Sequence, residues 1–368
     1  MRVWAADPDS LAPGLYSRCV ERRLICPDPV KDPEAFIAFL REGVGSFSSP
    51  PILFPTTDPY VHAVASHSEQ LNGRCVTYLP RRETIDDIVD KRQQYSIVQK
   101  HQIPIPTTCI LDSSEAVSDL ASSLKFPCVL KPVFSDRFRE RFNFKAVEVV
   151  SSRELLDVHK KYLRLGHPLL AQEIIPGGAE NLIEVMTFVR KNGILWAAFA
   201  ARKLEQFPED YGSGTIFESI RNENLLPLVS KVLEAFEFRG LCHMEFKWDA
   251  RDRQFKFIEL NPRTSNCSHH PTECGINFPW LVYLDATGAR LAEPQFDYEL
   301  GKVWVVPEVR MFRMGKLGMP RSAPRRIPWA RSYIQGVASI KDPLPELFFF
   351  LRGGVRDIAR AWSRVWSN

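Results

Sequence analysis

The chain has 368 residues, 45% of them hydrophobic and 25% charged, a composition that supports large buried cores and excludes intrinsic disorder. Its longest apolar run, residues 194–201, is far shorter than the roughly 18 residues that a membrane helix needs, and no signal peptide is recognisable at the N-terminus. The net charge of +4 divides unevenly, because residues 301–368 hold thirteen Lys and Arg against four Asp and Glu (+9), which leaves −5 for the first 300 residues. We expect a cytoplasmic protein of two or three domains with a basic C-terminal segment.

The first 85 residues predict a small open α/β layer. Strands are expected at 2–6 and 50–55, and helices at 32–41 and from residue 59 onward. No βα unit precedes the first strand, so we expect this layer to be trimmed or the given start to be late.

The following 200 residues predict strands and helices in mixed order. A helix over 85–101 begins with acidic residues and ends in Lys100 and His101, which suits the helix dipole. The remaining elements are predicted as a helix at 113–124, strands at 127–132 and 146–150 around a basic loop, a helix from 151, strands at 169–175, 180–190 and 194–204, a helix at 224–236, a hairpin of 240–249 with 254–261, and a helix at 279–287.

The predicted hairpin carries the most specific chemical signal in the chain. Side chains alternate along a strand, so Glu259 and Asn261 share one face, and pairing about the turn brings Glu245 beside Glu259. Two carboxylates and a carboxamide form the oxygen-rich site that Mg²⁺ prefers. Arg263, two residues beyond, is placed to stabilise a transferring phosphoryl group.

These acids could instead be the outward residues of amphipathic strands. Their neighbours, including Met244, Phe246 and Phe257, leave little polar surface for such a face. We therefore favour a metal site.

Four short motifs resemble those of the ATP-grasp ligases, in that family's order and approximate spacing. They are Val-Leu-Lys-Pro at 129–132, Gln-Glu-Ile-Ile-Pro-Gly at 172–177, Cys-His-Met-Glu at 242–245 and Glu-Leu-Asn-Pro-Arg at 259–263. The resemblance covers about residues 86–290 and is to the carboxylate–amine ligase branch, which is similar to carbamoyl phosphate synthase and D-aspartate ligase. It implies an α/β ATP-grasp fold with three parts: an N-terminal layer (1–85), an ATP-grasp domain (86–290) and a basic C-terminal helical extension (291–368).

The resemblance also implies roles for individual residues, with ATP and Mg²⁺ as cofactors and Mn²⁺ as an acceptable substitute. Glu245, Glu259 and Asn261 would hold the metal, and Arg263 would face the acyl phosphate. The implied nucleotide contacts are Lys91 and Lys131 at the phosphates, Glu173, Ile174 and Ile175 at the adenine, and Glu180 at the ribose. Arg202 and Lys203 lie where the family often places a second basic contact, and of these we choose Arg202.

One departure from the family concerns the loop at 133–145. That loop is usually rich in glycine, because backbone N–H groups close over phosphates. Here it has none, and we expect its polar side chains to grip phosphate or to form a solvated lid: Ser135, Arg137, Arg139, Arg141, Asn143 and Lys145.

A second candidate metal site is the cluster of Cys267, His269, His270 and Cys274. Thiolate and imidazole suit zinc, but the spacing fits no common zinc finger. All eight cysteines lack a C-x-x-C spacing, which indicates reduced thiols. A polar loop is the favoured interpretation of this stretch.

The predicted activity is ATP- and Mg²⁺-dependent ligation, in which a carboxylate is activated as an acyl phosphate and joined to an amine. The alternative is a non-catalytic nucleotide-binding protein on the same scaffold. A carboxylase or carbamoyl-phosphate enzyme would need further parts for which the chain has no room. Small-molecule carboxylates and amines are the expected partners, nucleic acid is not expected, and a homodimer stays open.

The basic C-terminal segment predicts a helix over 355–366 behind an apolar stretch at 344–351. We favour a helix packed on the body with a basic outer face, and keep as an alternative a peripheral contact with anionic lipid at the inner face of the membrane. The predicted apolar face consists of Val355, Ile358, Ala359, Trp362 and Trp366, and the basic face of Arg356, Arg360 and Arg364.

Overall fold

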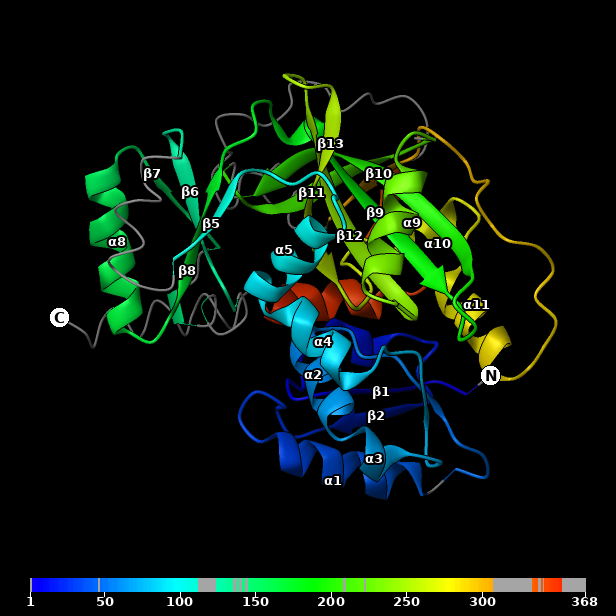
Figure 1. The fold of residues 1–368 in the computed structure, drawn as a ribbon. Helices are drawn as coiled ribbons and strands as arrows, with labels where there is room; N and C mark the ends of the chain where they lie inside the picture. Colours follow the sequence, from blue (N-terminus) through cyan, green and yellow to red (C-terminus); the bar gives the residue numbers. More distant parts are fainter. Residues whose placement is uncertain are drawn as a thin grey trace.

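A computed structural model of the chain shows a mixed α/β architecture with two main sheets (Figure 1). The structure describes residues 2–45, 47–111, 124–134, 138, 141–142, 145–207, 210–221, 223–306, 333–336, 339 and 341–352. The helices predicted at 113–124 and 355–366 lie almost wholly or wholly outside these residues, as do Ser135, Arg137, Arg139 and Asn143 of the basic loop.

The N-terminal residues form two short parallel strand pairs with helices packed beside them. Asp32 caps the first long helix by accepting a hydrogen bond from the backbone N–H of Ala35, and Pro33 occupies its first turn, where no donor is needed. The strands are β1 (Trp4–Asp7) with β2 (Arg22–Ile25), and β3 (Ile52–Leu53) with β4 (Val76–Thr77). The helices are the 3₁₀ turn η1 (Pro13–Tyr16), α1 (Pro33–Val44), α2 (Asp58–Ser66), α3 (Ser68–Leu71) and α4 (Arg82–Val89).

The single helix predicted over 85–101 is wrong. The structure has α4 and then α5 (Lys91–Lys100), because Asp90 adopts an extended conformation and its side chain accepts a hydrogen bond from the N–H of Arg92. An acid that could continue a helix acts here as an N-cap. Lys91 thereby becomes the first residue of a new helix, which Figure 1 shows between the two main sheets.

The smaller main sheet has four antiparallel strands, and among the described residues helix α8 (Ser152–Arg164) packs on it. The strand order is β5 (Thr108–Ile110), β8 (Leu169–Glu173), β6 (Cys128–Pro132) and β7 (Val147–Val149). Helix α8 begins with a reciprocal cap in which Ser151 accepts from Glu154 N–H and Glu154 accepts from Val150 N–H. Leu155 and Tyr162 of α8 pack on this sheet.

The larger sheet has seven strands with a hydrophobic core on each face. One core includes side chains of α5 and α9, and the other those of α11. The strands, in spatial order, are β13 (Gln254–Asn261), β12 (Gly240–Asp249), β9 (Leu182–Val189), β10 (Leu195–Phe207), β11 (Ser213–Ile220), β14 (Val303–Val305) and β15 (Tyr333–Gln335). The remaining helices are η2 (Ala179–Asn181), α9 (Leu226–Ala235), α10 (His269–Glu273) and α11 (Phe278–Ala286).

Three features of this sheet were not predicted. Strand β11 begins with Ser213, Gly214 and Thr215, small residues that give little strand signal in the sequence. Helix α10 occupies part of the predicted polar loop. Strands β14 and β15 belong to the segment expected as a C-terminal extension, and they extend the sheet beyond β11.

The N-terminal layer is fixed to the larger sheet at Gly240, the first residue of β12. Its φ is +103°, and a Cβ there would lie 1.9 Å from the backbone oxygen of Tyr78. The same tyrosine donates a hydrogen bond from its hydroxyl to Asp285 of α11, which also accepts from Arg190 at the end of β9. Only glycine permits this approach of the two backbones.

Replacing Gly240 with Ala should destabilise the protein by more than its backbone strain alone. Gly275→Ala is the matched control, because its φ is +112° and no atom lies within 4 Å of the added Cβ. We expect Gly275→Ala to lower the free energy of unfolding by about 1–2 kcal/mol, and Gly240→Ala to add a further loss of about 1–3 kcal/mol from overpacking. Urea unfolding measures both, and equal losses would contradict the tight contact with Tyr78.

Candidate functional site

Three carboxylates lie side by side on one face of the larger sheet. The register pairs Glu245 of β12 with Glu259 of β13 on one side and with Glu184 of β9 on the other. Residues paired across antiparallel strands point to the same face, so the three acids form a row across three strands. The predicted pairing of Glu245 with Glu259 is confirmed, and Glu184 is an addition that the sequence analysis missed.

Lys91 neutralises one end of this row. Its Nζ lies 3.1 Å from Oε2 of Glu259, and both side chains are largely buried. Burial alone would raise the pKa of Glu259, but the charges of Lys91 and then Lys145 hold it well below its usual range. The reciprocal effect applies to Lys91, whose burial lowers its pKa less than the carboxylate of Glu259 raises it. The pair is therefore ionised.

Lys203 neutralises the middle of the row. It is 2% exposed, and its Nζ lies 3.5 Å from Glu245 and 3.9 Å from Glu184. Arg202, the basic residue chosen from the sequence, points to the opposite face of β10 and pairs with Glu218 at 2.6 Å. The parity of the strand therefore places Lys203 in the carboxylate row and Arg202 outside it.

His243 completes a buried charge network with Glu184. Its Nε2 lies 2.9 Å from Oε2 of Glu184, although the atoms are not aligned for a hydrogen bond. Burial opposes the charged imidazole, but Glu184 raises the pKa of His243 on balance. Two carboxylates, Glu184 and Glu245, thus face the ammonium group of Lys203 and the imidazole of His243.

Among the described residues, one group of side chains could hold a metal ion. It consists of Glu184, His243 and Glu245, whose ligand atoms lie within 4.8 Å of one another. This group shares Glu245 with the trio predicted from the sequence. The other two predicted ligands lie next to it: Asn261 pairs with His243 in the register, and its Nδ2 donates to Oε1 of Glu259 at 3.2 Å.

The sequence did contain a signal for Glu184, because it is a charged residue within an otherwise apolar strand. Its neighbours are Leu182, Ile183, Val185 and Met186. Burying such a carboxylate is costly unless it is paired. That rule could have selected Glu184 from the sequence.

Lys131 approaches the same region from the smaller sheet. Its Nζ donates to Oε1 of Gln172 at 2.7 Å, and Gln172 is itself buried and bonded to Thr108. Burial, followed by the positive charge of Lys91, lowers the pKa of Lys131 to about 8, against the attraction of Glu259 and Glu245. Cations from α5 and β6 therefore converge with carboxylates from β12 and β13 between the two sheets.

The residues predicted to line an adenine and ribose pocket lie at the end of β8 and just beyond it. Glu173 accepts from the N–H of Thr107 at 2.8 Å and pairs with Arg251 at 3.0 Å. Ile175 is buried and Ile174 is half-buried. Glu180 lies in η2 and accepts from the N–H of Gly178 at 3.2 Å. Glu173 thus has partners within the chain, whereas Glu180 stays in a surface turn.

Arg263 links the site to the N-terminal layer. Its guanidinium makes two parallel hydrogen bonds to Asp58, the first residue of α2, at 2.6 and 3.0 Å. Both side chains are about four-fifths buried. Bidentate pairing of this kind fixes the orientation of an arginine. Local sequence patterns could not pair Arg263 with Asp58, because the two residues are 205 positions apart.

The cysteine–histidine cluster at 267–274 forms no metal group among the described residues. Cys267 lies against Glu184 at 3.5 Å, His270 bonds the backbone oxygen of Lys302, and His269 pairs with Glu273 in α10. The polar loop favoured from the sequence is wrong, because residues 269–273 form helix α10 and Cys267, His270 and Cys274 are buried.

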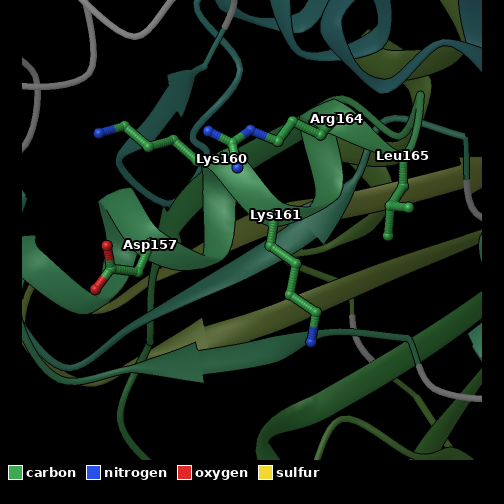
Figure 2. A pocket seen from close by; sticks show the side chains of 5 residues that line it. All are labelled: Asp157, Lys160, Lys161, Arg164 and Leu165. Carbon is green, nitrogen blue, oxygen red and sulfur yellow. The ribbon is translucent and has the colours of Figure 1, made fainter.

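A surface hollow lies at the C-terminal half of α8 (Figure 2). It is lined by Asp157, Lys160, Lys161, Arg164 and Leu165, and by no residue of the carboxylate row. Cations in the last turn suit the negative end of the helix dipole, which accounts for them without a ligand.

Comparison with known sequences gives distant relatives. No protein-family model matches the chain. The chain is 24% identical over 293 residues to D-aspartate ligase of Enterococcus faecium (strain Aus0004), which covers 75% of this chain and 69% of that protein. It is 22% identical over 225 residues to the carbamoyl phosphate synthase large chain of Methanothermobacter thermautotrophicus, covering 58% of this chain but only 21% of that much longer protein.

Comparison with solved structures shows the same architecture. An ADP complex of N5-carboxyaminoimidazole ribonucleotide synthetase has a TM-score of 0.62 at 15% identity, covering 82% of this chain and 74% of that one. L-amino acid ligase from Bacillus licheniformis has a TM-score of 0.58 at 19% identity, covering 78% and 74%. Biotin carboxylase from Campylobacter jejuni has a TM-score of 0.60 at 19% identity, covering 81% and 68%. These structural similarities show a shared fold.

Substituting Lys203 and Arg202 separately should distinguish the two faces of β10. Lys203→Met leaves Glu184 and Glu245 with less compensating charge, and we expect a loss of about 3–5 kcal/mol in unfolding free energy. Arg202→Met removes a partly exposed pair and should cost about 0–1 kcal/mol. Chemical denaturation of both variants measures the difference. A small effect at Lys203 would contradict its place in the network.

Proposed function

From the premise that the chain has the fold of the ATP-grasp superfamily, which its motifs also resemble, we propose that it is an ATP- and Mg²⁺-dependent ligase that joins a carboxylate to an amine. The observation that carries the proposal is the convergence of Lys91, Lys131 and Lys203 on paired Glu245 and Glu259 between the two sheets. The distant similarity to D-aspartate ligase and to L-amino acid ligase supports an amino acid as one substrate.

The donor set suits a hard cation. Glu245 and Glu259 retain 19% and 28% side-chain exposure, so each can offer oxygen toward the space between the sheets. In the described structure their charges are matched by lysine ammonium groups, which indicates that this point of the fold requires positive charge. Glu245, Glu259 and Asn261 would hold Mg²⁺, which when bound neutralises phosphoryl oxygens during transfer. Glu184 and His243 lie close enough to orient Glu245.

The remaining residues would bind and orient the reactants. A carboxylate repels an incoming amine until its charge is removed, and an acyl phosphate provides that activation. Lys91 and Lys131 would contact phosphate oxygens, as would Lys203 in preference to Arg202. Glu173, Ile174, Ile175 and Glu180 would surround the nucleoside. Arg263, oriented by Asp58, would stabilise charge on the acyl phosphate.

Hydroxylamine trapping tests the reaction directly. Protein incubated with ATP, Mg²⁺, hydroxylamine and a panel of carboxylates that includes both enantiomers of aspartate should yield a hydroxamate and ADP with at least one of them. Nucleotide binding without any hydroxamate or acceptor-dependent ADP would favour the alternative of a non-catalytic nucleotide-binding protein.

Glu259→Gln tests the metal and phosphate site in the same assay. Losing one charged oxygen ligand should lower kcat by at least about a hundredfold. Glu273→Gln is the control, since Glu273 is exposed and pairs with His269, which is also exposed. Thermal melting of both variants checks that the fold persists. Unchanged turnover in Glu259→Gln would remove this residue from the site.

Nucleotide affinity should fall as pH rises above about 8, the pKa of Lys131. The ammonium form binds phosphate, and Lys131 loses its proton well below the usual pKa of a lysine, so affinity is highest well below pH 8 and declines as pH rises through 8. Lys131→Arg should keep its charge and flatten this decline. Isothermal titration of ADP across pH 7–10 makes the measurement, and a parallel decline in Lys131→Arg would refute the assignment.

The lowered pKa of Lys131 also makes the stability of the fold rise with pH. A buried lysine with a lowered pKa disfavours folding fully below pH 8, and this penalty is relieved as pH rises toward the pKa of about 10.4 in the unfolded chain. Relative to Lys131→Met, the wild-type protein should therefore gain stability between these values. Urea midpoints of the two proteins at several pH values follow this difference.

A further inference from the structure

The helical residues 344–352 expose a row of leucines. Leu344, Leu347 and Leu351 are 43%, 51% and 46% exposed, and their i, i+3, i+7 spacing places them on one side of the helix. We call these three residues the leucine face. Aliphatic residues repeated on one exposed helix side differ from isolated surface leucines, which need no explanation.

The helix is held firmly to the N-terminal layer, beside which Figure 1 shows it in red. Phe348 stacks on Tyr16 with ring centroids 3.2 Å apart. Asp342 accepts from the hydroxyl of Ser17 at 2.6 Å, and Arg352 pairs with Asp9 at 2.6 Å. Contacts at both ends and in the middle fix which side of the helix faces outward. The leucine face is therefore a fixed surface.

Basic side chains border this surface. Phe348 is next to Leu344 and Leu351 around the helix, and the guanidinium of Arg23 lies over the ring of its stacking partner Tyr16, 4.6 Å from the centroid. Arg18 reaches the backbone oxygen of Lys341 at 3.0 Å, just before the helix.

We propose that the leucine face is a docking surface for an anionic lipid bilayer. An apolar helix side bordered by cations is suited to lie in the membrane interface, where leucines enter the acyl boundary and Arg and Lys contact anionic headgroups. A stable protein interface buries roughly 800 Å² per partner, and three leucine side chains supply far less area than that. No helix in the described part of the chain is long and apolar enough to cross a bilayer.

Vesicle co-sedimentation of the full chain tests the proposal. The protein should pellet with vesicles of phosphatidylcholine and phosphatidylglycerol, and much less with phosphatidylcholine alone. Added salt should release it, because headgroup attraction is screened. The triple variant Leu344→Ser, Leu347→Ser, Leu351→Ser should bind at least about tenfold more weakly, as expected for losing three partly exposed aliphatic side chains.

The matched control is Leu165→Ser, Ile194→Ser, Leu300→Ser, which removes three comparably exposed aliphatics (38%, 48% and 49%) elsewhere. It should bind like the wild type. Arg23→Gln, which leaves the leucines intact, should reduce only the salt-sensitive part of binding. Circular dichroism melting verifies that each variant is folded.

Three results would overturn the proposal. They are absence of vesicle binding by the wild type, equal binding to neutral and anionic vesicles, and wild-type binding by the leucine variant. Light scattering adds a fourth: a dimer in the wild type that becomes a monomer in the leucine variant would assign this face to a second copy of the chain. All of these readouts are independent of ligase activity.

Discussion

The row of carboxylates on the larger sheet, with Glu184 buried and Glu245 and Glu259 partly buried, sets the charge pattern of the whole site. Glu184, Glu245 and Glu259 occupy directly paired positions on neighbouring strands, where like charges repel strongly in a medium of low dielectric. The row is stable only because Lys203 and Lys91 reach it from β10 and α5. Each cation is fixed by its own element, so the positions of these elements follow from the need to pair the acids.

The N-terminal layer contributes to this site through a small number of specific contacts. Asp58 orients Arg263, and the close approach of Gly240 to Tyr78 joins the layer to the first residue of β12. Strand β12 carries His243 and Glu245 a few residues later. A displacement of the layer would therefore change both the arginine and the acids, and this coupling joins the layer to the candidate site.

Local sequence signals predicted the parts of the site that lie within one strand or one hairpin. The alternation in 254–261 and the turn after Asp249 were sufficient to place Glu259, Asn261 and Glu245 together. The same reasoning failed at residues 85–101, where Asp90 could equally continue a helix or cap a new one. The family resemblance pointed to Arg202 and its neighbour Lys203 alike, and only the strand's parity in the structure assigns Lys203 to the face of the carboxylate row.

The sequence by itself determined the mixed α/β class, most of the strands and helices, and the acidic pair with its neighbouring arginine. Only the tertiary structure decided which cations meet these acids, that Glu184 and His243 join them, and that Asp58 holds Arg263. The physical reason is the separation along the chain over which each effect acts. Periodicity and capping act over a few residues, whereas charge pairing in a core depends on contacts between residues such as Lys91 and Glu259, 168 positions apart, which only the packed sheets bring together.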